Sequence, residues 1–134
     1  MAMDNLFGVF DVSTSGMRAE WSRMEVIANN LANAETTRTP EGGPYRKRHV
    51  VFSTMLDGMK GVKLDGTVES KLPPREVFKP GHPHADENGF VSMPNISRPK
   101  EMSNLMQASR AYQANMAAMR NLKTICEETL KLLR

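Results

Sequence analysis

The sequence lacks the features that mark several large classes of protein. Its single cysteine, Cys126, excludes an internal disulfide framework. No apolar run approaches the roughly 18 residues that a membrane-spanning helix needs. The net charge of +3, from 18 basic and 15 acidic residues, is too small to indicate nucleic acid as a ligand. We therefore expect a chain that neither spans a membrane nor binds nucleic acid.

Catalytic and targeting motifs are missing as well. There is no GxSxG nucleophile motif, no glycine-rich phosphate loop and no Cys–His pair in a catalytic context. The N-terminus has no basic region followed by a long apolar run and a small-residue cleavage site. The sequence thus predicts a protein that is not an enzyme and has no cofactor or metal. If it acts outside the cytoplasm, we expect export without a cleaved signal peptide.

What the chain does contain is a 3–4 spacing of apolar residues at both ends. The front stripe consists of Phe7, Phe10, Met17, Trp21, Met24, Ala28 and Leu31. The back stripe consists of Met102, Leu105, Tyr112, Met116, Met119, Cys126, Leu130 and Leu133. A mean spacing near 3.5 is typical of a coiled-coil seam. We expect one long helix from Asp4 or Asn5 to about Asn33 and a second that starts by Glu101.

Between the helices the sequence favours short strands and turns. Thr, Gly and Pro accumulate over residues 35–44, which predicts a loop. β-branched and aromatic residues predict four strands, at residues 45–52, 59–70, 75–79 and 90–93. Tight turns that tolerate a positive φ are predicted at Asp57-Gly58, Asp65-Gly66 and Asn88-Gly89.

The expected fold is therefore α+β, with two terminal helices forming an antiparallel coiled coil around a small middle rich in β-hairpins. We divide the chain into an N-terminal helix (1–36), a β-rich middle (37–98) and a C-terminal helix (99–134).

Three asparagines gather in the last turn of the first predicted helix, at Asn29, Asn30 and Asn33. Asparagine is unfavourable inside a helix, but its side chain bonds well to backbone at a helix end or to a neighbouring chain. Small residues between them, Ala32 and Ala34, would allow another chain to approach closely. We interpret this turn as an assembly element.

Two other interpretations remain open. His82 and His84 alternate in a proline-rich loop and are followed by Asp86, so a small metal-dependent enzyme is one alternative if further ligands converge. No HExxH helix, cysteine partner or second histidine pair supports it. The basic run Arg46–Arg48 gives the other alternative, a coiled-coil adaptor for acidic partners, although its β-rich surroundings favour an ordinary solvated strand.

Four segments carry a family resemblance. Residues 28–36 (ANNLANAET) and 101–115 (EMSNLMQASRAYQAN) resemble the paired terminal motifs of bacterial flagellar rod, hook and hook-associated proteins. Residues 44–47 and 80–95, together with the short middle, are similar to the proximal-rod type of that family. The sequence departs from the family pattern at Ala28, where serine is frequent. The motif residues that we assign to assembly are Asn29, Asn30, Leu31, Asn33, Tyr45, Arg46, Asn104, Arg110, Tyr112, Gln113 and Asn115.

The resemblance implies a structural subunit of the basal-body rod, a drive shaft that transmits torque and conducts exported subunits. Its expected partners are the other proximal and distal rod subunits, the adaptor at the rod base near the MS ring, and the flagellar export apparatus. The expected location is the part of the rod that spans the periplasm, with the chain in a helical tube of like and unlike subunits.

Overall fold

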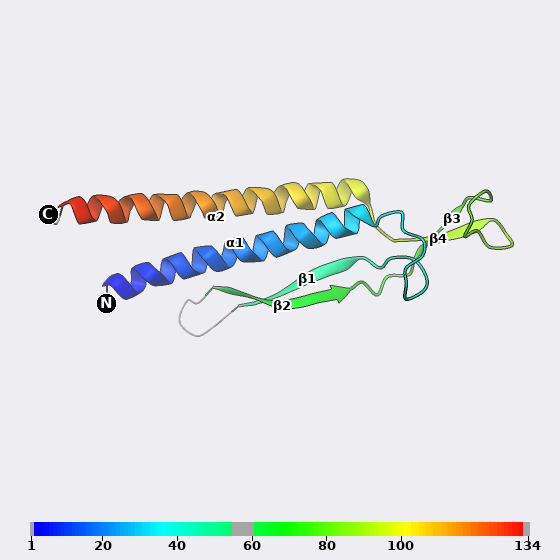
Figure 1. Cartoon of the computed structure of the whole chain (residues 1–134), viewed down its shortest axis with the longest axis horizontal. Coiled ribbons are helices and arrows are strands. Elements are labelled where there is room, and N and C mark those ends of the chain that lie inside the picture. Colours follow the sequence, from blue (N-terminus) through cyan, green and yellow to red (C-terminus); the bar gives the residue numbers. More distant parts are fainter. Residues whose placement is uncertain (1, 55–60, 133–134) are drawn as a thin grey trace.

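Two long antiparallel helices dominate the structure, and both chain termini lie at the same end of an elongated molecule (Figure 1). The computed structural model describes residues 2–54 and 61–132. Helix α1 runs over Ala2–Ala32 and helix α2 over Arg98–Leu132. The predicted α+β fold with a terminal helix pair is confirmed. Within the described residues, neither helix is both long enough and apolar enough to cross a bilayer.

The two helices pack through positions that the apolar stripes did not predict. On α1 the buried apolar residues are Ala19 and Ile27, whereas Trp21 of the front stripe is 60% exposed. On α2 the buried apolar residue is Ala108, and the back-stripe residue Met102 is 55% exposed. The predicted seam was wrong at these positions. Small residues face the partner helix because they allow close approach, and a pattern of large apolar residues does not reveal them.

Gly16 shows how close that approach is. A Cβ atom added at Gly16 would lie 2.9 Å from Nδ2 of Asn115 on α2. The absence of a side chain at Gly16 therefore makes room for the amide of Asn115, and glycine, unfavourable inside a helix, is explained here by packing.

The middle forms two separate antiparallel hairpins. Strand β1 (Arg48–Thr54) pairs with β2 (Val62–Glu69), and β3 (Arg75–Phe78) pairs with β4 (Phe90–Met93). The β1–β2 hairpin lies along α1, and the β3–β4 hairpin lies at the end opposite the termini (Figure 1). The four predicted strands are confirmed in position, with β1 starting later than expected. The predicted turn at Asp57-Gly58 lies outside the described residues.

One predicted turn was wrong and one is confirmed. Gly66 lies inside β2 opposite Val51, next to a shift in the pairing, with φ of 123°. The positive φ of Gly66 therefore belongs to a β-bulge and not to a turn, and the bulge bends the strand without ending it. Gly89 does close the β3–β4 turn, with φ of 82° and its N–H bonded to Asp86 O at 3.0 Å.

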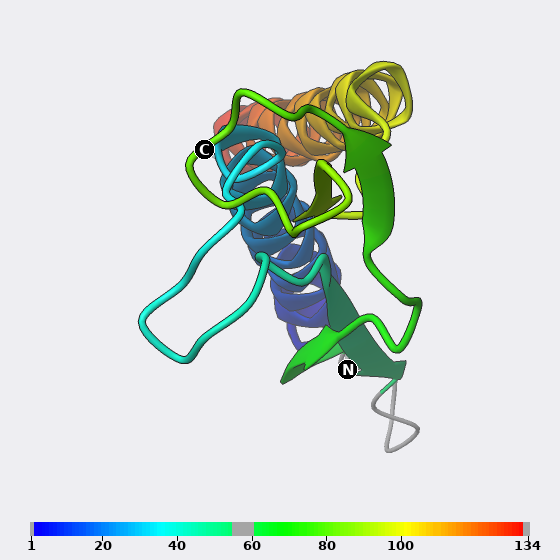
Figure 2. The same cartoon turned by 90° about the vertical axis from the view of Figure 1, so that its right-hand side faces the viewer.

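A small core lies at β4 and in the segment that leads from β4 to α2. Along β4 the side chains alternate, with Val91 and Met93 buried and Phe90 and Ser92 exposed. Ile96, which follows the strand, is also buried. Figure 2 views the molecule from this end, where the loops and the β3–β4 hairpin gather around the ends of the helices. Met93 and Ile96 share a groove with Ala34 after α1 and with Arg98 at the start of α2, so this core lies next to the ends of the helices that carry the candidate site.

Candidate assembly site

A cluster of polar side chains joins the end of α1 to the start of α2 and to β1. We call Asn30, Tyr45, Lys47, Arg48 and Glu101 the polar junction. Asn30 and Glu101 are each 1% exposed, which makes them the only buried polar or charged residues among those that the structure describes. Burying such groups costs free energy unless every one of them is bonded.

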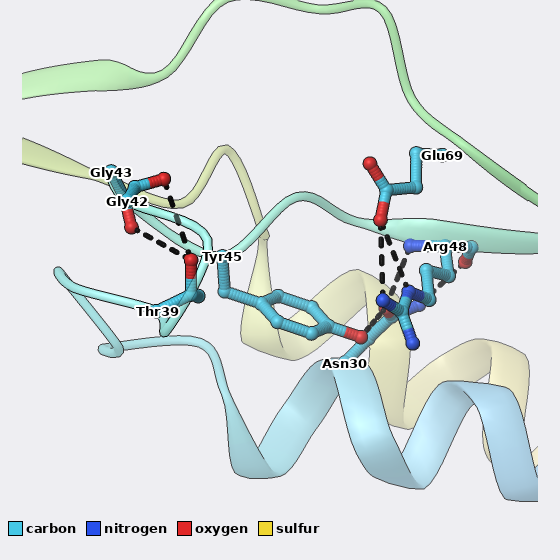
Figure 3. A network of polar contacts seen from close by, with 7 residues as sticks. All are labelled: Asn30, Thr39, Gly42, Gly43, Tyr45, Arg48 and Glu69. Atoms are coloured by element: carbon cyan, nitrogen blue, oxygen red, sulfur yellow. Dashed lines mark hydrogen bonds and ion pairs between the residues drawn. The ribbon is translucent and has the colours of Figure 1, made fainter.

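Asn30 makes all four hydrogen bonds that an asparagine side chain allows. Its Nδ2 donates to Arg48 O at 2.8 Å and to Glu101 Oε2 at 3.4 Å. Its Oδ1 accepts the Arg48 N–H at 2.9 Å and the Tyr45 hydroxyl at 3.1 Å (Figure 3). The Asn30 amide thus bonds to both the N–H and the carbonyl of Arg48, as the backbone of a neighbouring strand would. These two bonds connect the start of β1 to α1.

Glu101 forms the second half of the junction. Its Oε1 pairs with Lys47 Nζ at 2.6 Å and accepts a long bond from Asn104 Nδ2 at 3.5 Å. The Lys47 side chain is itself only 17% exposed. A buried ion pair adds little net stability, but removing one partner leaves an uncompensated charge. The pair therefore selects one arrangement of α2 against the segment before β1.

Tyr45 and Arg48 lie on the solvent side of the polar junction. Arg48 pairs with Glu69 on β2 at 3.2 Å and lies over the Tyr45 ring, 5.8 Å from its centroid. Burial raises the pKa of the Tyr45 hydroxyl, Arg48 lowers it and Glu69 raises it again, with burial the largest effect. Tyr45 therefore remains a neutral hydrogen-bond donor to Asn30 at physiological pH.

The loop before Tyr45 is held by its own hydrogen bonds. Thr39 Oγ1 donates to Gly42 O at 3.4 Å and to Gly43 O at 3.3 Å (Figure 3). The Tyr45 N–H bonds to Thr36 O at 3.0 Å, in the segment that follows the end of α1 at Ala32. The loop thus returns the chain to α1 and points Tyr45 at Asn30.

The other two asparagines of the turn lie outside the polar junction: the Asn33 side chain bonds within its own turn, and Asn29 is exposed. Asn33 Nδ2 donates to Asn29 O at 2.9 Å, and Asn33 Oδ1 accepts the Thr36 hydroxyl at 3.1 Å. Asn29 is exposed beside the β1–β2 hairpin. The expectation that these side chains bond backbone is confirmed for Asn30 and Asn33.

The remaining predicted site residues do not join the junction as one site. Tyr112 is half-buried on α2 and its ring lies 6.2 Å from that of Trp21, while Asn115 faces Gly16. Leu31 is half-buried, whereas Arg46, Arg110 and Gln113 are exposed. The motif residues therefore divide between the junction, the helix seam and the outer surface.

Lys47 and Glu101 were not among the predicted site residues. In the sequence they look like ordinary solvated charges, one in a basic run and one in the first turn of a helix. No local pattern distinguishes them, because their burial depends on segments far apart in the chain.

The histidines and the aspartate of the metal-site alternative make other hydrogen bonds in the structure. His84 Nδ1 contacts Thr37 Oγ1 at 2.8 Å, and His82 Nδ1 accepts the His84 N–H at 3.1 Å. The Asp86 carboxylate accepts N–H groups of the turn that follows it. Over residues 2–54 and 61–132, no group of three His, Cys, Asp or Glu side chains is placed to hold a metal ion.

The basic run does not form a continuous basic surface either. Lys47 is half-buried and paired with Glu101, and Arg48 is paired with Glu69, so two of the three charges of Arg46–Arg48 are already compensated within the chain. The adaptor alternative thereby loses the patch on which it depended.

Comparison with known proteins identifies the family. Residues 10–38 match the model of the flagella basal body rod protein, and residues 87–132 match that of the flagellar basal body rod FlgEFG protein C-terminal region. The chain is 42% identical to the flagellar basal-body rod protein FlgC of Salmonella typhimurium over 130 residues, which cover 95% of this chain and 97% of the relative.

This chain belongs to the FlgC family of flagellar basal-body rod proteins.

More distant FlgC proteins agree with this assignment. The FlgC of Aquifex aeolicus is 35% identical over 132 residues, covering 96% of this chain and 98% of that protein. The FlgC of Borreliella burgdorferi is 31% identical over 149 residues, with 96% and 98% covered. The two segments that match the basal-body rod models supply Asn30 and Glu101, while Lys47 and Arg48 come from the middle between them.

Proposed function

We propose that this chain is a structural subunit of the flagellar basal-body rod that carries out no reaction and transmits torque through contacts with its neighbours. Its partners would be other proximal and distal rod subunits, the adaptor at the rod base and the export apparatus. It would act in the part of the rod that spans the periplasm, after export without a cleaved signal peptide. Residues 1–36 and 99–134 would form the helical core, with 37–98 outside it.

The observation that carries this proposal is the exposure of the front stripe. Trp21 is 60% exposed and Ala28 is exposed, while Phe10, Met17, Met24 and Leu31 are half-buried. A stripe of apolar side chains that the rest of the chain leaves partly exposed is typical of an interaction surface. Methionine adapts its shape to different neighbours, which suits a subunit whose contacts are not all alike.

The polar junction supports the proposal in a second way. It fixes how α1, α2 and β1 lie relative to one another, and its main contacts are made within the chain. A subunit that carries force needs such a rigid corner, so Asn30 and Tyr45 would act in assembly by shaping the subunit. The exposed Arg46, Arg110 and Gln113 would then be the motif residues that contact neighbours.

Trp21→Glu tests the proposal. We expect this variant to keep the unfolding midpoint of the unchanged chain, because the side chain is mostly exposed, and to lose self-association in sedimentation velocity. In a bacterium lacking its own copy of this protein, the variant should fail to restore rods and swimming. The matched control is Val68→Glu, which changes an apolar side chain that is 54% exposed on β2. Rods and motility restored by Trp21→Glu as well as by the control would reject the proposal.

A further inference from the structure

Three hydrogen bonds hold a short turn in the loop that connects β3 to β4. We call residues 82–84 the histidine turn. The His82 N–H donates to Lys79 O at 3.0 Å, and the Ala85 N–H donates to His82 O at 3.0 Å. The His84 N–H donates to the side chain of His82, at Nδ1, over 3.1 Å. The backbone of this turn is therefore held in part by a side chain that can change its charge.

The bond to His82 Nδ1 depends on the charge of the ring. In neutral imidazole one nitrogen carries a proton and the other accepts a hydrogen bond, whereas in the cation both nitrogens carry protons. A backbone N–H can only donate, so the His82 ring must be neutral here, with its proton on Nε2. Protonation of Nδ1 would set two N–H groups against each other and break the bond. Histidine is the residue type whose charge ordinarily changes between about pH 5 and 8, so mild acid can supply that proton.

The histidine turn also carries the contact between this loop and the segment that follows α1. Thr37 Oγ1 lies 2.8 Å from His84 Nδ1. Among the residues that the structure describes, this is the only hydrogen bond between residues 36–44 and residues 75–93. The His84 ring can keep this bond in either charge state, because a hydroxyl group both donates and accepts. The position of the His84 ring, however, follows its backbone, and that backbone is held by His82.

The charged groups around the histidine turn belong to the hairpin and its loop. Glu76 on β3 and Asp86 line a groove of about 270 Å³ together with His84. The segment after α1 contributes only uncharged residues to this groove, and they are Thr37, Gly43 and Pro44. In the chain, Lys79 precedes the turn and Glu87 follows it, and both are exposed. The rings of the two histidines lie edge to face with centroids 5.5 Å apart, so positive charge on both would add repulsion that favours an open turn.

We infer that the histidine turn is an acid-sensitive joint between the β3–β4 hairpin and the segment that follows α1. At neutral and higher pH, uncharged His82 accepts the His84 N–H and holds His84 beside Thr37. In mild acid His82 takes up a proton from solvent, the turn opens, and the hairpin loses its hydrogen bond to residues 36–44. The released segment leads to Tyr45, so the joint acts next to the polar junction. This inference goes beyond the proposed function and does not rest on it, because it concerns the folded chain alone.

Substitutions at His82 test the joint directly. Asparagine and aspartate side chains accept the backbone N–H two residues further on, and neither takes up a proton as histidine does over about pH 5–8. Asp86 already makes this bond to the Asn88 N–H at 2.9 Å. His82→Asn and His82→Asp should therefore keep the turn closed in mild acid. His49→Asn is the matched control, because His49 is exposed on β1 and lies outside the loop, so this variant should keep the acid response.

NMR spectroscopy gives the readout, and with three histidines in the chain these variants assign the ring signals. At about pH 8 the His82 ring should be the Nε2–H tautomer, and a nuclear Overhauser effect should connect the His84 ring to the Thr37 methyl group. At about pH 5 this effect should be lost in the unchanged chain and in the control, and it should persist in at least one of the two His82 variants.

Three results would overturn the inference. The first is an Nδ1–H tautomer of His82 at about pH 8, which is incompatible with the bond from the His84 N–H. The second is an Overhauser effect between His84 and Thr37 that persists at about pH 5 in the unchanged chain. The third is its loss in both His82 variants at either pH, because the joint requires only an acceptor at that position.

Discussion

The side-chain amide of Asn30 on α1 lies 3.4 Å from the carboxylate of Glu101 on α2, although 71 residues separate them in the sequence. Both side chains are 1% exposed. Asn30 also bonds to the backbone of Arg48, and Glu101 pairs with Lys47, so this one contact connects both helices to the start of β1. The direction of the helix pair is thus set at one end of the molecule.

Replacing Asn30 with leucine should destabilise the fold. The change leaves the Tyr45 hydroxyl, the Arg48 N–H and the Arg48 carbonyl without their partner, and each unsatisfied buried group costs about 1–3 kcal/mol. We expect a loss of about 3 kcal/mol in the free energy of unfolding, measured with urea. Asn33→Leu is the matched control, because its bonds lie at an accessible helix end, and it should cost about 1 kcal/mol. Equal losses for both variants would contradict the role given to Asn30.

Lys47 and Glu101 should behave as a coupled pair. Lys47→Met or Glu101→Leu alone leaves one buried charge without its partner, at a cost of about 3–5 kcal/mol. The double variant removes both charges, so its loss should be clearly smaller than the two single losses added together. Urea unfolding of the four proteins completes this double-mutant cycle. Additive losses would show that the ion pair does not couple α2 to the segment before β1.

Tyr45 should make the stability of the fold depend on pH at alkaline values. Because its pKa is raised above 10.0 by burial, the folded state holds the phenolic proton more tightly than the unfolded state. This contribution is fully present below the unfolded pKa and is lost as pH rises through the higher folded pKa. The difference in unfolding free energy between the unchanged chain and Tyr45→Phe should therefore shrink above pH 10.0.

Phenolate absorbance offers a direct check of the same prediction. The chain has two tyrosines, Tyr45 and Tyr112, so the Tyr45→Phe variant reports Tyr112 alone and the difference spectrum reports Tyr45. A Tyr45 titration midpoint at or below 10.0 would show that its hydroxyl is not held neutral by burial.

Gly66→Ala should test whether the backbone of β2 has a positive φ at this position. Gly66 has φ of 123° and nothing within 4 Å of an added Cβ, so the substitution strains the backbone without a steric clash. A conformation that alanine rarely adopts costs about 1–3 kcal/mol. Gly81→Ala is the control, because Gly81 also has open space but no positive φ, and it should leave the unfolding midpoint nearly unchanged. Matching midpoints for the two variants would argue against the bulge in β2.

Much of the fold was predictable because long periodic patterns are strong signals. The helices appear at both ends, as predicted, and the four strands lie in the predicted segments. The seam was not predictable in the same way. A stripe of large apolar residues marks a surface that needs a partner, but it does not show whether that partner lies in the same chain. Trp21 is the clearest example, since its exposure makes it a candidate contact between subunits.

The site was predictable only in part for a related reason. The asparagine turn is a local signal, and it correctly identified Asn30 as a residue that bonds backbone. Its partners come from 18 and 71 residues away, so the sequence could not show which of the three asparagines would be buried. Lys47 and Glu101 lie in segments of the family resemblance, but nothing in the sequence showed that they are paired in the interior, because a buried ion pair and two solvated charges have the same composition.

Because the polar junction lies at one end of the helix pair, a small rotation at the junction produces a large displacement at the other end. Helix α1 runs over Ala2–Ala32, so its first residue lies about 42 Å from Asn30 at 1.5 Å per residue. A rotation of about 5° at Asn30 would displace the far end of α1 by roughly 4 Å, which is close to the distance between neighbouring Cα atoms. Small changes of side-chain geometry at one corner would thus be magnified at the termini, so the bonds of Asn30 and Glu101 help to hold the far ends of the two helices in position.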